Sequence, residues 1–480
     1  MYNSGLPSKP AALDNETEDR WRQNSLRYRM LTGLWISDLE EELQRHFTAE
    51  RRAVLGIADM SSNVFSGVTK ALTSLYVEPP SVSSIAPAEQ LLGRDGIIYR
   101  GGLWSIMQRV QLYTVGLREM FLHVGINAAE DGLVYRPVTP DYIYATSPRN
   151  DPMHPNYLME LRLRKKEDGD YLWTYDVYDL RDKNNPQFRI LVAESNGEIG
   201  EDVSAEYGGA AVGAKYPYRK ANGEPILPYS IYHAELTGDS LFDSFTGAEL
   251  VAGSLVSAAL HTYLIHLTRD CAFPLRYTLG ADIAGASTFD AAGAARRVAI
   301  AADPSSIICF SPDPEMAGLG QPVLGQFSSN ADPEQLLNVI TLYERKLAQS
   351  AGISPASIQK LSGDPRSGYA IAMSKSDQRD AQRKAIPAMS RGDSYTLELS
   401  AVMSNRFLGT SFPEEGYQIS YHSIPLNKDE LESQRKDLIE KMASGLITKI
   451  DAIQTLHPDF SREEAAEYLR EIKRQQIEFQ

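Results

Sequence analysis

One short pattern in the chain combines residue types that could carry out acyl-transfer chemistry. Ser357 and Lys360 stand three positions apart, which is the Ser-x-x-Lys spacing of serine acylases. The Ser-Asp-Asn and Lys-Thr-Gly partner motifs of those enzymes are absent from the sequence. A pattern with two fixed positions arises often by chance, so we predict no catalytic residue here.

Basic residues form a second pattern, whose chemistry would be contact with phosphate groups. Lys375, Arg379 and Arg383 recur at every fourth position, which places them in one stripe along a helix. Asp377 and Asp380 lie close to them in the sequence. An ordinary surface helix with local ion pairs therefore remains an alternative to a basic binding face.

The sequence contains no clear pattern of residues for binding a metal or a cofactor. The chain has eight histidines, and they are scattered. His261 and His266 are five positions apart, about 140° around a helix, which is poor geometry for a shared metal. Walker, dinucleotide-fingerprint, His-Glu-x-x-His and Gly-x-Ser-x-Gly motifs are absent. We therefore expect no metal, no cofactor and no enzymatic activity.

Three predicted helices must position the basic residues. Residues 240–272 contain no proline and have apolar residues at helical spacing, so they predict one long helix. The small residues Ser254, Ser257 and Ala258 would allow another helix to approach it closely. Asp332, Pro333 and Glu334 have the chemistry of a helix start, and that helix should end near residue 352. We expect a loop at residues 353–368, because this segment contains two glycines and two prolines. A third helix should extend from 369 to about 408, with a bend at Pro387.

The rest of the chain predicts a mixed fold. Helical patterns cover 21–47, 49–75, 86–92 and 104–117, whereas residues 1–16 look disordered. Strand patterns follow from about residue 124, and helical patterns return in the last 53 residues. We predict an α+β fold that is mainly helical. The predicted strands cover 133–138, 141–144, 157–165, 171–180, 189–194, 230–233, 276–279, 298–300, 306–310 and 417–421.

Composition narrows the classes of protein that remain. The net charge of −15 argues against a site-specific DNA-binding protein with a basic face. Two cysteines cannot form a disulfide framework, and the first residues lack the apolar core of a secretory signal. Residues 250–268 carry no formal charge and are just long enough to span a bilayer. They contain two serines, two threonines and two histidines, so a packing helix is the preferred interpretation.

Several short motifs resemble the portal proteins of tailed double-stranded DNA bacteriophages. They are Ala351-Gly352-Ile353-Ser354, then Ser367-Gly368-Tyr369-Ala370 before a long polar helix, and Ser444-Gly445-Leu446-Ile447-Thr448-Lys449 before His457-Pro458-Asp459 and a glutamate-rich helix. The resemblance covers most of the chain in element order. It implies a ring-forming subunit with a wing (1–239 and 369–427), stem helices (240–272 and 333–351), a clip (273–332), a tunnel loop (352–368) and a crown (428–480).

The resemblance also implies roles for residues. Ser357, Gln359, Lys360 and Arg366 would lie in the tunnel loop and face the central channel, where the two cations would touch DNA phosphates briefly. The basic stripe Lys375, Arg379 and Arg383 would continue from that loop. Ser254, Ser257 and Ala258 would pack the stem.

The implied function is a conduit for DNA packaging and ejection at one capsid vertex, assembled in the host cytoplasm and carried in the virion. The implied partners are other copies in a ring of about twelve, the terminase large subunit, the major capsid and scaffolding proteins, a head-completion adaptor and non-specifically contacted double-stranded DNA, with no membrane. Another virion connector or minor capsid protein is the first alternative. An enzyme acting on a nucleic acid or an acyl substrate is the second.

Overall fold

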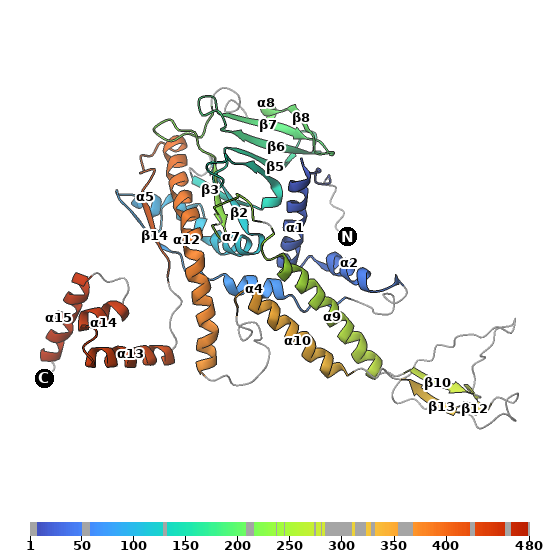
Figure 1. Ribbon diagram of the computed structural model, residues 1–480. Helices are drawn as coiled ribbons and strands as arrows, with labels where there is room; N and C mark the ends of the chain where they lie inside the picture. The colour runs from blue at the N-terminus through green and yellow to red at the C-terminus, as the bar shows by residue number, and fades with distance from the viewer. Residues whose placement is uncertain are drawn as a thin grey trace. The chain divides into compact units, whose positions relative to one another are not determined.

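The computed structural model in Figure 1 is a mixed α+β protein, and about half of its described residues are helical. Its chain divides into two compact units. Unit 1 comprises residues 1–34, 64–251 and 348–480, and unit 2 comprises 35–63 and 252–347. The structure describes residues 7–49, 58–127, 132–207, 216–236, 238–243, 245–272, 275–279, 281–283, 310–312, 323–327, 332–353, 368–422, 428–456 and 462–478.

A three-stranded antiparallel sheet lies at the centre of unit 1, in the order β3-β2-β9. Its strands are β2 (Glu119–Asn127), β3 (Gly132–Val138) and β9 (Tyr229–His233). Leu122 and Val124 on β2 are fully buried in the main hydrophobic cluster, together with residues of α7 (Leu103–Leu117) and α12 (Gly368–Phe407). The sheet is thus covered by α7, which directly precedes β2 in the sequence, and by the distant helix α12 (Figure 1).

A second antiparallel sheet in unit 1 has five strands in sequence order. Alternation of apolar and polar residues predicts its centre well, because β5 covers Tyr157–Lys165 and β6 begins at Tyr171. The predicted strands at 141–144 and 189–194 correspond to β4 and β7 with shifted ends, since residues 140–142 form a 3₁₀ turn. The remaining strands are β4 (Ile143–Thr146), β6 (Tyr171–Asp179), β7 (Gln187–Ala193) and β8 (Ile199–Asp202).

The N-terminal helices differ from the sequence prediction. The pattern at 21–47 is two helices, because Gly33 adopts a left-handed conformation (φ 82°) that ends α1 (Asn15–Thr32) before α2 (Ile36–His46) begins. Residues 7–14, predicted to be disordered, are held by Lys9, which contacts Asp141 and the rings of Trp21 and Tyr142. The other short helices are α4 (Val64–Leu72), α5 (Glu89–Leu92), α6 (Ile97–Arg100) and α8 (Ser204–Tyr207).

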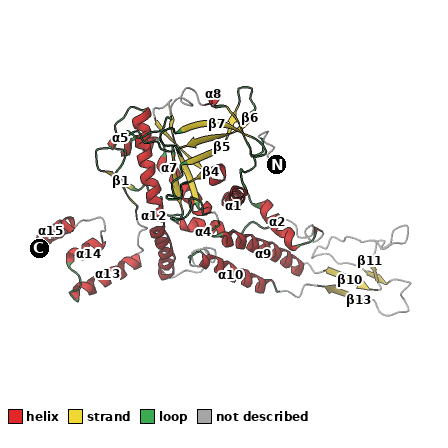
Figure 2. Cartoon of the chain, turned by 45° about the horizontal axis from the view of Figure 1, so that its top comes forward, coloured by secondary structure: helices red, strands yellow, loops and turns green. Residues whose placement is uncertain are grey.

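The C-terminal part of unit 1 follows the predicted order. The long helix α12 contains Pro387, and the strand after it, β14 (Tyr417–Ser420), pairs with β1 (Ser81–Ser84). Three helices end the chain: α13 (Lys428–Ala443), α14 (Lys449–Leu456) and α15 (Arg462–Glu478). Thr448 and Asp451 form a reciprocal cap at the start of α14. Figure 2 shows these helices after the last strand.

Unit 2 contains α2 together with most of two longer helices, α9 (Ala248–Ala272) and α10 (Pro333–Ser350). Asp332 accepts a hydrogen bond from the Glu334 amide, which confirms the predicted start of α10. The prediction that the first long helix begins at residue 240 is wrong. Asp243 is held by Arg118, residues 245–247 form a turn that ends with the left-handed Gly247 (φ 78°), and the helix begins only at Ala248.

Candidate functional site

The helices α9 and α10 lie antiparallel and in close contact. A Cβ atom on Gly253 would come within 2.4 Å of Leu347 Cδ2, and Ser257 on α9 donates to Glu344 on α10 at 2.7 Å. Residue numbers therefore increase along α9 in the direction in which they decrease along α10, as in an antiparallel pair. Both Figure 1 and Figure 2 show the two helices side by side. Small residues on α9 therefore allow the close approach that the sequence predicts.

One carboxylate joins three segments of unit 2. Glu344 Oε1 accepts hydrogen bonds from Ser62, from Ser257 at 2.7 Å and from His261 Nε2 at 3.0 Å. The Asp59 amide donates to Thr262 at 2.8 Å, which ties the 58–63 segment to α9 a second time. Three donors on one oxygen hold the two helices and this segment in a fixed register.

The pKa values of Glu344 and His261 shift in directions that favour their charged forms. Burial alone would raise the pKa of Glu344, but the hydrogen bonds from His261, Ser62 and Ser257 outweigh it and lower the pKa from 4.5 to about 2. The hydrogen bond to Glu344 in turn raises the pKa of His261 above 6.5. The pair is therefore a charged pair in weakly acidic solution, and it stabilises the contact between α9 and α10.

The structure places the predicted stem residues inside a single chain. The side chains of Ser254, Ser257 and Ala258 are all fully buried. Ser257 contacts α10 of the same chain through Glu344. These small residues are therefore explained by packing within one subunit, and they are unavailable as a surface for a neighbouring copy.

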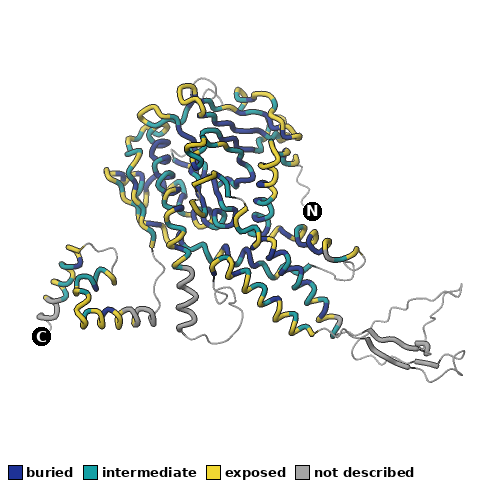
Figure 3. Tube along the Cα trace, in the orientation of Figure 1, coloured by how far each residue is buried: buried dark blue, intermediate teal, exposed yellow. Residues whose placement is uncertain are grey.

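Large apolar side chains elsewhere on the same helices remain exposed. Val339 is 58 % exposed and Leu342 is 55 % exposed, and both lie on α10. Ile265 on α9 and Leu337 on α10 are also about half exposed. Sequence periodicity did not single out these four residues, because it shows that a helix has an apolar face without showing which apolar residues another element covers. In Figure 3, exposed positions alternate with buried ones along both helices.

The region between α9 and α10 continues the antiparallel pairing. In this region β10 (Leu275–Leu279) pairs with β13 (Val323–Phe327), and β11 (Ala281–Ile283) pairs with β12 (Phe310–Pro312). The prediction of a strand at 276–279 is confirmed. Of the predicted strand 306–310, residue 310 lies in β12, and residues 306–309 lie outside the described residues. The predicted strand 298–300 lies outside the described residues. The chain therefore leaves α9 and returns to α10 as paired strands.

The predicted tunnel loop follows α10 in the sequence and precedes α12. Ser357, Gln359, Lys360 and Arg366 lie outside the described residues, so their predicted channel contacts stay predictions. The loop begins after Gly352, whose left-handed conformation (φ 76°) ends α10 as expected. It ends at Gly368, the first residue of α12.

The predicted basic stripe lies on α12 near its start. Arg383 is exposed and makes a long ion pair with Asp380 at 3.8 Å, with 79 % and 67 % of the two side chains exposed. An ion pair this exposed contributes little, so it leaves Arg383 able to contact an anion. Arg379 is partly buried, and the side chain of Lys375 lies outside the described set. The local ion pair agrees with the surface-helix alternative.

A buried carboxylate that the sequence analysis missed anchors the middle of α12. Asp393 is 1 % exposed and accepts hydrogen bonds from the hydroxyls of Tyr76, Tyr232 and Tyr421, at 2.7, 2.9 and 2.6 Å. Burial raises the pKa of Asp393 to about 6, and the three hydroxyls partly offset that rise. The cluster fastens α12 to β9 and to two distant segments, and it positions the helix that carries the basic stripe.

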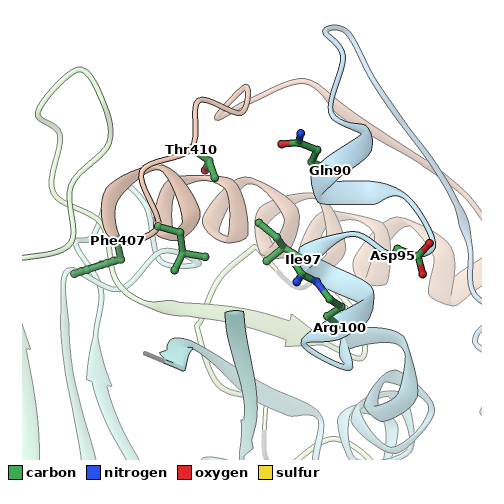
Figure 4. Close-up of a pocket in the computed structure, with 7 residues that line it drawn as sticks. Gln90, Asp95, Ile97, Arg100, Phe407 and Thr410 are labelled. Carbon is green, nitrogen blue, oxygen red and sulfur yellow. The ribbon is translucent and has the colours of Figure 1, made fainter. Parts of the chain in front are cut away.

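Two hollows in unit 1 could accept a ligand. The smaller, about 560 Å³, lies between the region of α5 and α6 and the end of α12 (Figure 4). Asp95 and Arg100 lie on one side of it, and Phe407 and Thr410 lie on the other. The larger, about 800 Å³, lies beside β9 and α12. Across the residues that the structure describes, no group of three histidine, cysteine or acidic side chains is arranged to bind a metal.

The helix α9 also meets the length and composition of a membrane span over Ala248–Arg269. Half of its most apolar window is buried within the fold. The polar side chains Ser257, His261 and Thr262 bond other parts of unit 2. Such a polar, bonded face is typical of a helix packed inside a protein.

Comparisons with known proteins do not identify the chain. Neither protein-family models nor curated proteins give a match.

Proposed function

We propose that this chain is the portal subunit of a tailed bacteriophage, a ring-forming conduit for packaging and ejecting DNA. One observation carries the proposal. Two antiparallel helices, α9 and α10, flank two pairs of antiparallel strands in the sequence. The 40-residue helix α12 begins 18 positions after α10 ends. This order is what the resemblance implies for stem, clip, tunnel loop and wing.

The exposed apolar residues of unit 2 support assembly into a ring. Ile265, Leu337, Val339 and Leu342 lie on the proposed stem helices, and each is between 45 % and 58 % exposed in a single chain. Full burial of such a side chain from full exposure contributes about 1.5–3 kcal/mol, so covering the exposed half contributes about half as much and still favours contact with a neighbouring copy. The lateral contact would therefore use this outer surface, while Ser254, Ser257 and Ala258 hold each subunit's own helices together.

The charge of the chain supports transient contact with DNA. A net charge of −15 disfavours lasting adhesion to a polyanion. Lys360 and Arg366 in the loop, with Arg379 and Arg383 on α12, would offer a few phosphate contacts in each subunit. Binding strength grows with the number of phosphates neutralised, so few contacts leave the duplex free to move.

The partners follow from this role. We propose that the strand-paired insert 273–332 contacts the terminase large subunit during packaging and the head-completion adaptor afterwards. Capsid and scaffolding proteins would surround the wing in the virion. In this proposal the subunit hydrolyses no nucleotide, and the terminase supplies the energy.

Negative-stain microscopy with mass photometry tests the assembly. The purified chain should form rings with an open axial channel. The double variant Val339→Glu and Leu342→Glu should dissociate them, because two carboxylates would be buried in the contact. The variant Ile199→Glu is the matched control, since Ile199 is 46 % exposed on β8 and lies outside the stem. Absence of rings from the unmodified chain at all concentrations would refute the proposal.

Deletion of residues 355–364 tests the DNA role separately. Proheads carrying this deletion should assemble and dock the motor, because the flanking helices keep their own contacts. Packaging of DNA, measured by nuclease protection, should stop or fall sharply. A normal yield of protected DNA would exclude a channel role for this loop.

A further inference from the structure

The larger cleft in unit 1 has features of a binding site that the portal proposal does not use. Its walls come from the loop at 148–156, the turn at 180–183, the segment 220–227, strand β9 and helix α12. Its volume of about 800 Å³ lies within the range of ligand sites, 300–1,000 Å³. All of these elements belong to unit 1.

Two consecutive contacts, from Arg391 to His154 and from His154 to Asp151, hold the guanidinium of Arg391 in place at the edge of this cleft. Arg391 Nη2 donates to His154 Nε2 at 2.8 Å, and His154 Nδ1 lies 2.7 Å from Asp151 Oδ1. Arginine can only donate, so Nε2 must accept and Nδ1 must carry the proton that is donated to Asp151. The guanidinium of Arg391 therefore faces a neutral ring, and in the described parts of the chain no carboxylate forms an ion pair with it.

A buried imidazole lies close to the same arginine. His233 on β9 lines the cleft, is 7 % exposed and has no side-chain hydrogen bond within the described ranges. Burial lowers its pKa to about 4, and the positive charge of Arg391 adds to that effect. A neutral His233 can donate one hydrogen bond to an incoming acceptor. The cleft thus presents an unpaired cation and an unused donor at one place.

Apolar side chains make up much of the remaining surface. A ligand in this cleft would therefore lie against hydrocarbon on one side and meet the cation of Arg391 on the other. The apolar lining residues include Met153, Leu180, Ile226, Leu227 and Ile231.

We propose that this cleft binds an extended acidic peptide segment of a partner protein, with one carboxylate on Arg391 and His233 and apolar neighbours on Leu227 and Ile231. A single carboxylate fits better than a phosphate. Asp151, Glu224 and Glu398 line the same cleft and would repel a dianion more strongly than a monoanion. The inference is independent of whether the chain forms rings.

Fluorescence polarisation with two labelled hexapeptides tests the proposal. One is a leucine-rich hexapeptide with a single glutamate, and the other carries glutamine at that position. We expect the glutamate peptide to bind at least about tenfold more tightly, as a charge-assisted hydrogen bond allows. Arg391→Met should remove this preference, and since Arg391 is exposed the variant should fold normally. Arg94→Met is the control, because Arg94 is an exposed arginine outside the cleft.

Three results would overturn the inference. The first is equal binding of the two peptides, or no binding of either at millimolar concentration. The second is an unchanged preference in Arg391→Met. The third is displacement of the glutamate peptide by inorganic phosphate at lower concentration than by free butyrate, a monocarboxylate, which would assign the site to phosphate. Displacement by butyrate only at much higher concentration than by unlabelled peptide would support a peptide ligand.

Discussion

Replacing Glu344 with alanine tests the contact between α9 and α10. The change removes the oxygen that accepts from Ser62, Ser257 and His261. A hydrogen bond to a charged group contributes about 1.5–3 kcal/mol net. The three bonds share one oxygen, and the carboxylate is 25 % exposed, so water recovers part of the loss. We expect the local free energy of opening to fall by about 2–4 kcal/mol, less than the sum of three separate bonds.

Hydrogen exchange measures this local stability without requiring that the whole chain unfold in one step. A loss of 2–4 kcal/mol corresponds to amide exchange about 30- to 700-fold faster, since 1.4 kcal/mol is tenfold. The acceleration should appear in both α9 and α10, around Ser257 and Glu344. Glu334→Ala is the control, because Glu334 is an exposed carboxylate on the same helix and should change exchange by about fivefold or less.

The variant Glu344→Gln separates charge from shape. Its amide oxygen can still accept a hydrogen bond, whereas its charge is lost, so its exchange should fall between the natural chain and Glu344→Ala. Equal exchange rates in Glu344→Ala and Glu334→Ala would show that the carboxylate does not hold the helices. Acceleration confined to α10 would show that Glu344 supports its own helix alone.

Three further outcomes follow from the structure. Local stability of α9 and α10, measured by exchange at several pH values, should be greatest between about pH 4.5 and 6.5. The Glu344 contribution is lost as pH falls from 4.5 toward its folded pKa of about 2, and the His261 contribution is lost as pH rises from 6.5 through its raised folded pKa. Asp393→Ala should reduce unfolding free energy, measured in urea, by about 2–4 kcal/mol, because three tyrosine hydroxyls lose their shared acceptor. Gly253→Val should cost about 1–3 kcal/mol in the same assay, because its Cβ would collide with Leu347.

Local patterns predicted the regular elements that depend on neighbouring residues. Alternation identified β5, whose bounds match, and cap chemistry identified the start of α10 at Pro333. Strands β1 and β8 were missed because each has four residues and is largely polar. Strand β1 exists through its pairing with β14, and that partner lies more than 300 residues away.

The start of α9 shows how a distant contact overrides helical spacing. Residues 240–247 have a helical pattern, but Arg118 holds Asp243 at 2.9 Å and buried Glu119 accepts the Asp243 amide. These partners precede Asp243 by more than 120 residues, so no local window contains them. Sequence analysis missed Glu344, Asp393 and Arg391 for the same reason, because their partners come close to them only in the folded chain.

The tyrosine cluster around Asp393 has a consequence for synthesis of the protein. Tyr76 and Asp393 are separated by 317 positions, so a ribosome adding about 5–20 residues per second makes the second about 15–65 s after the first. During that interval the hydroxyl of Tyr76 and the face of the central sheet covered by α12 have no native partner. A nascent chain stalled before residue 393 would therefore expose a surface that chaperones bind, and fragments truncated there should be degraded.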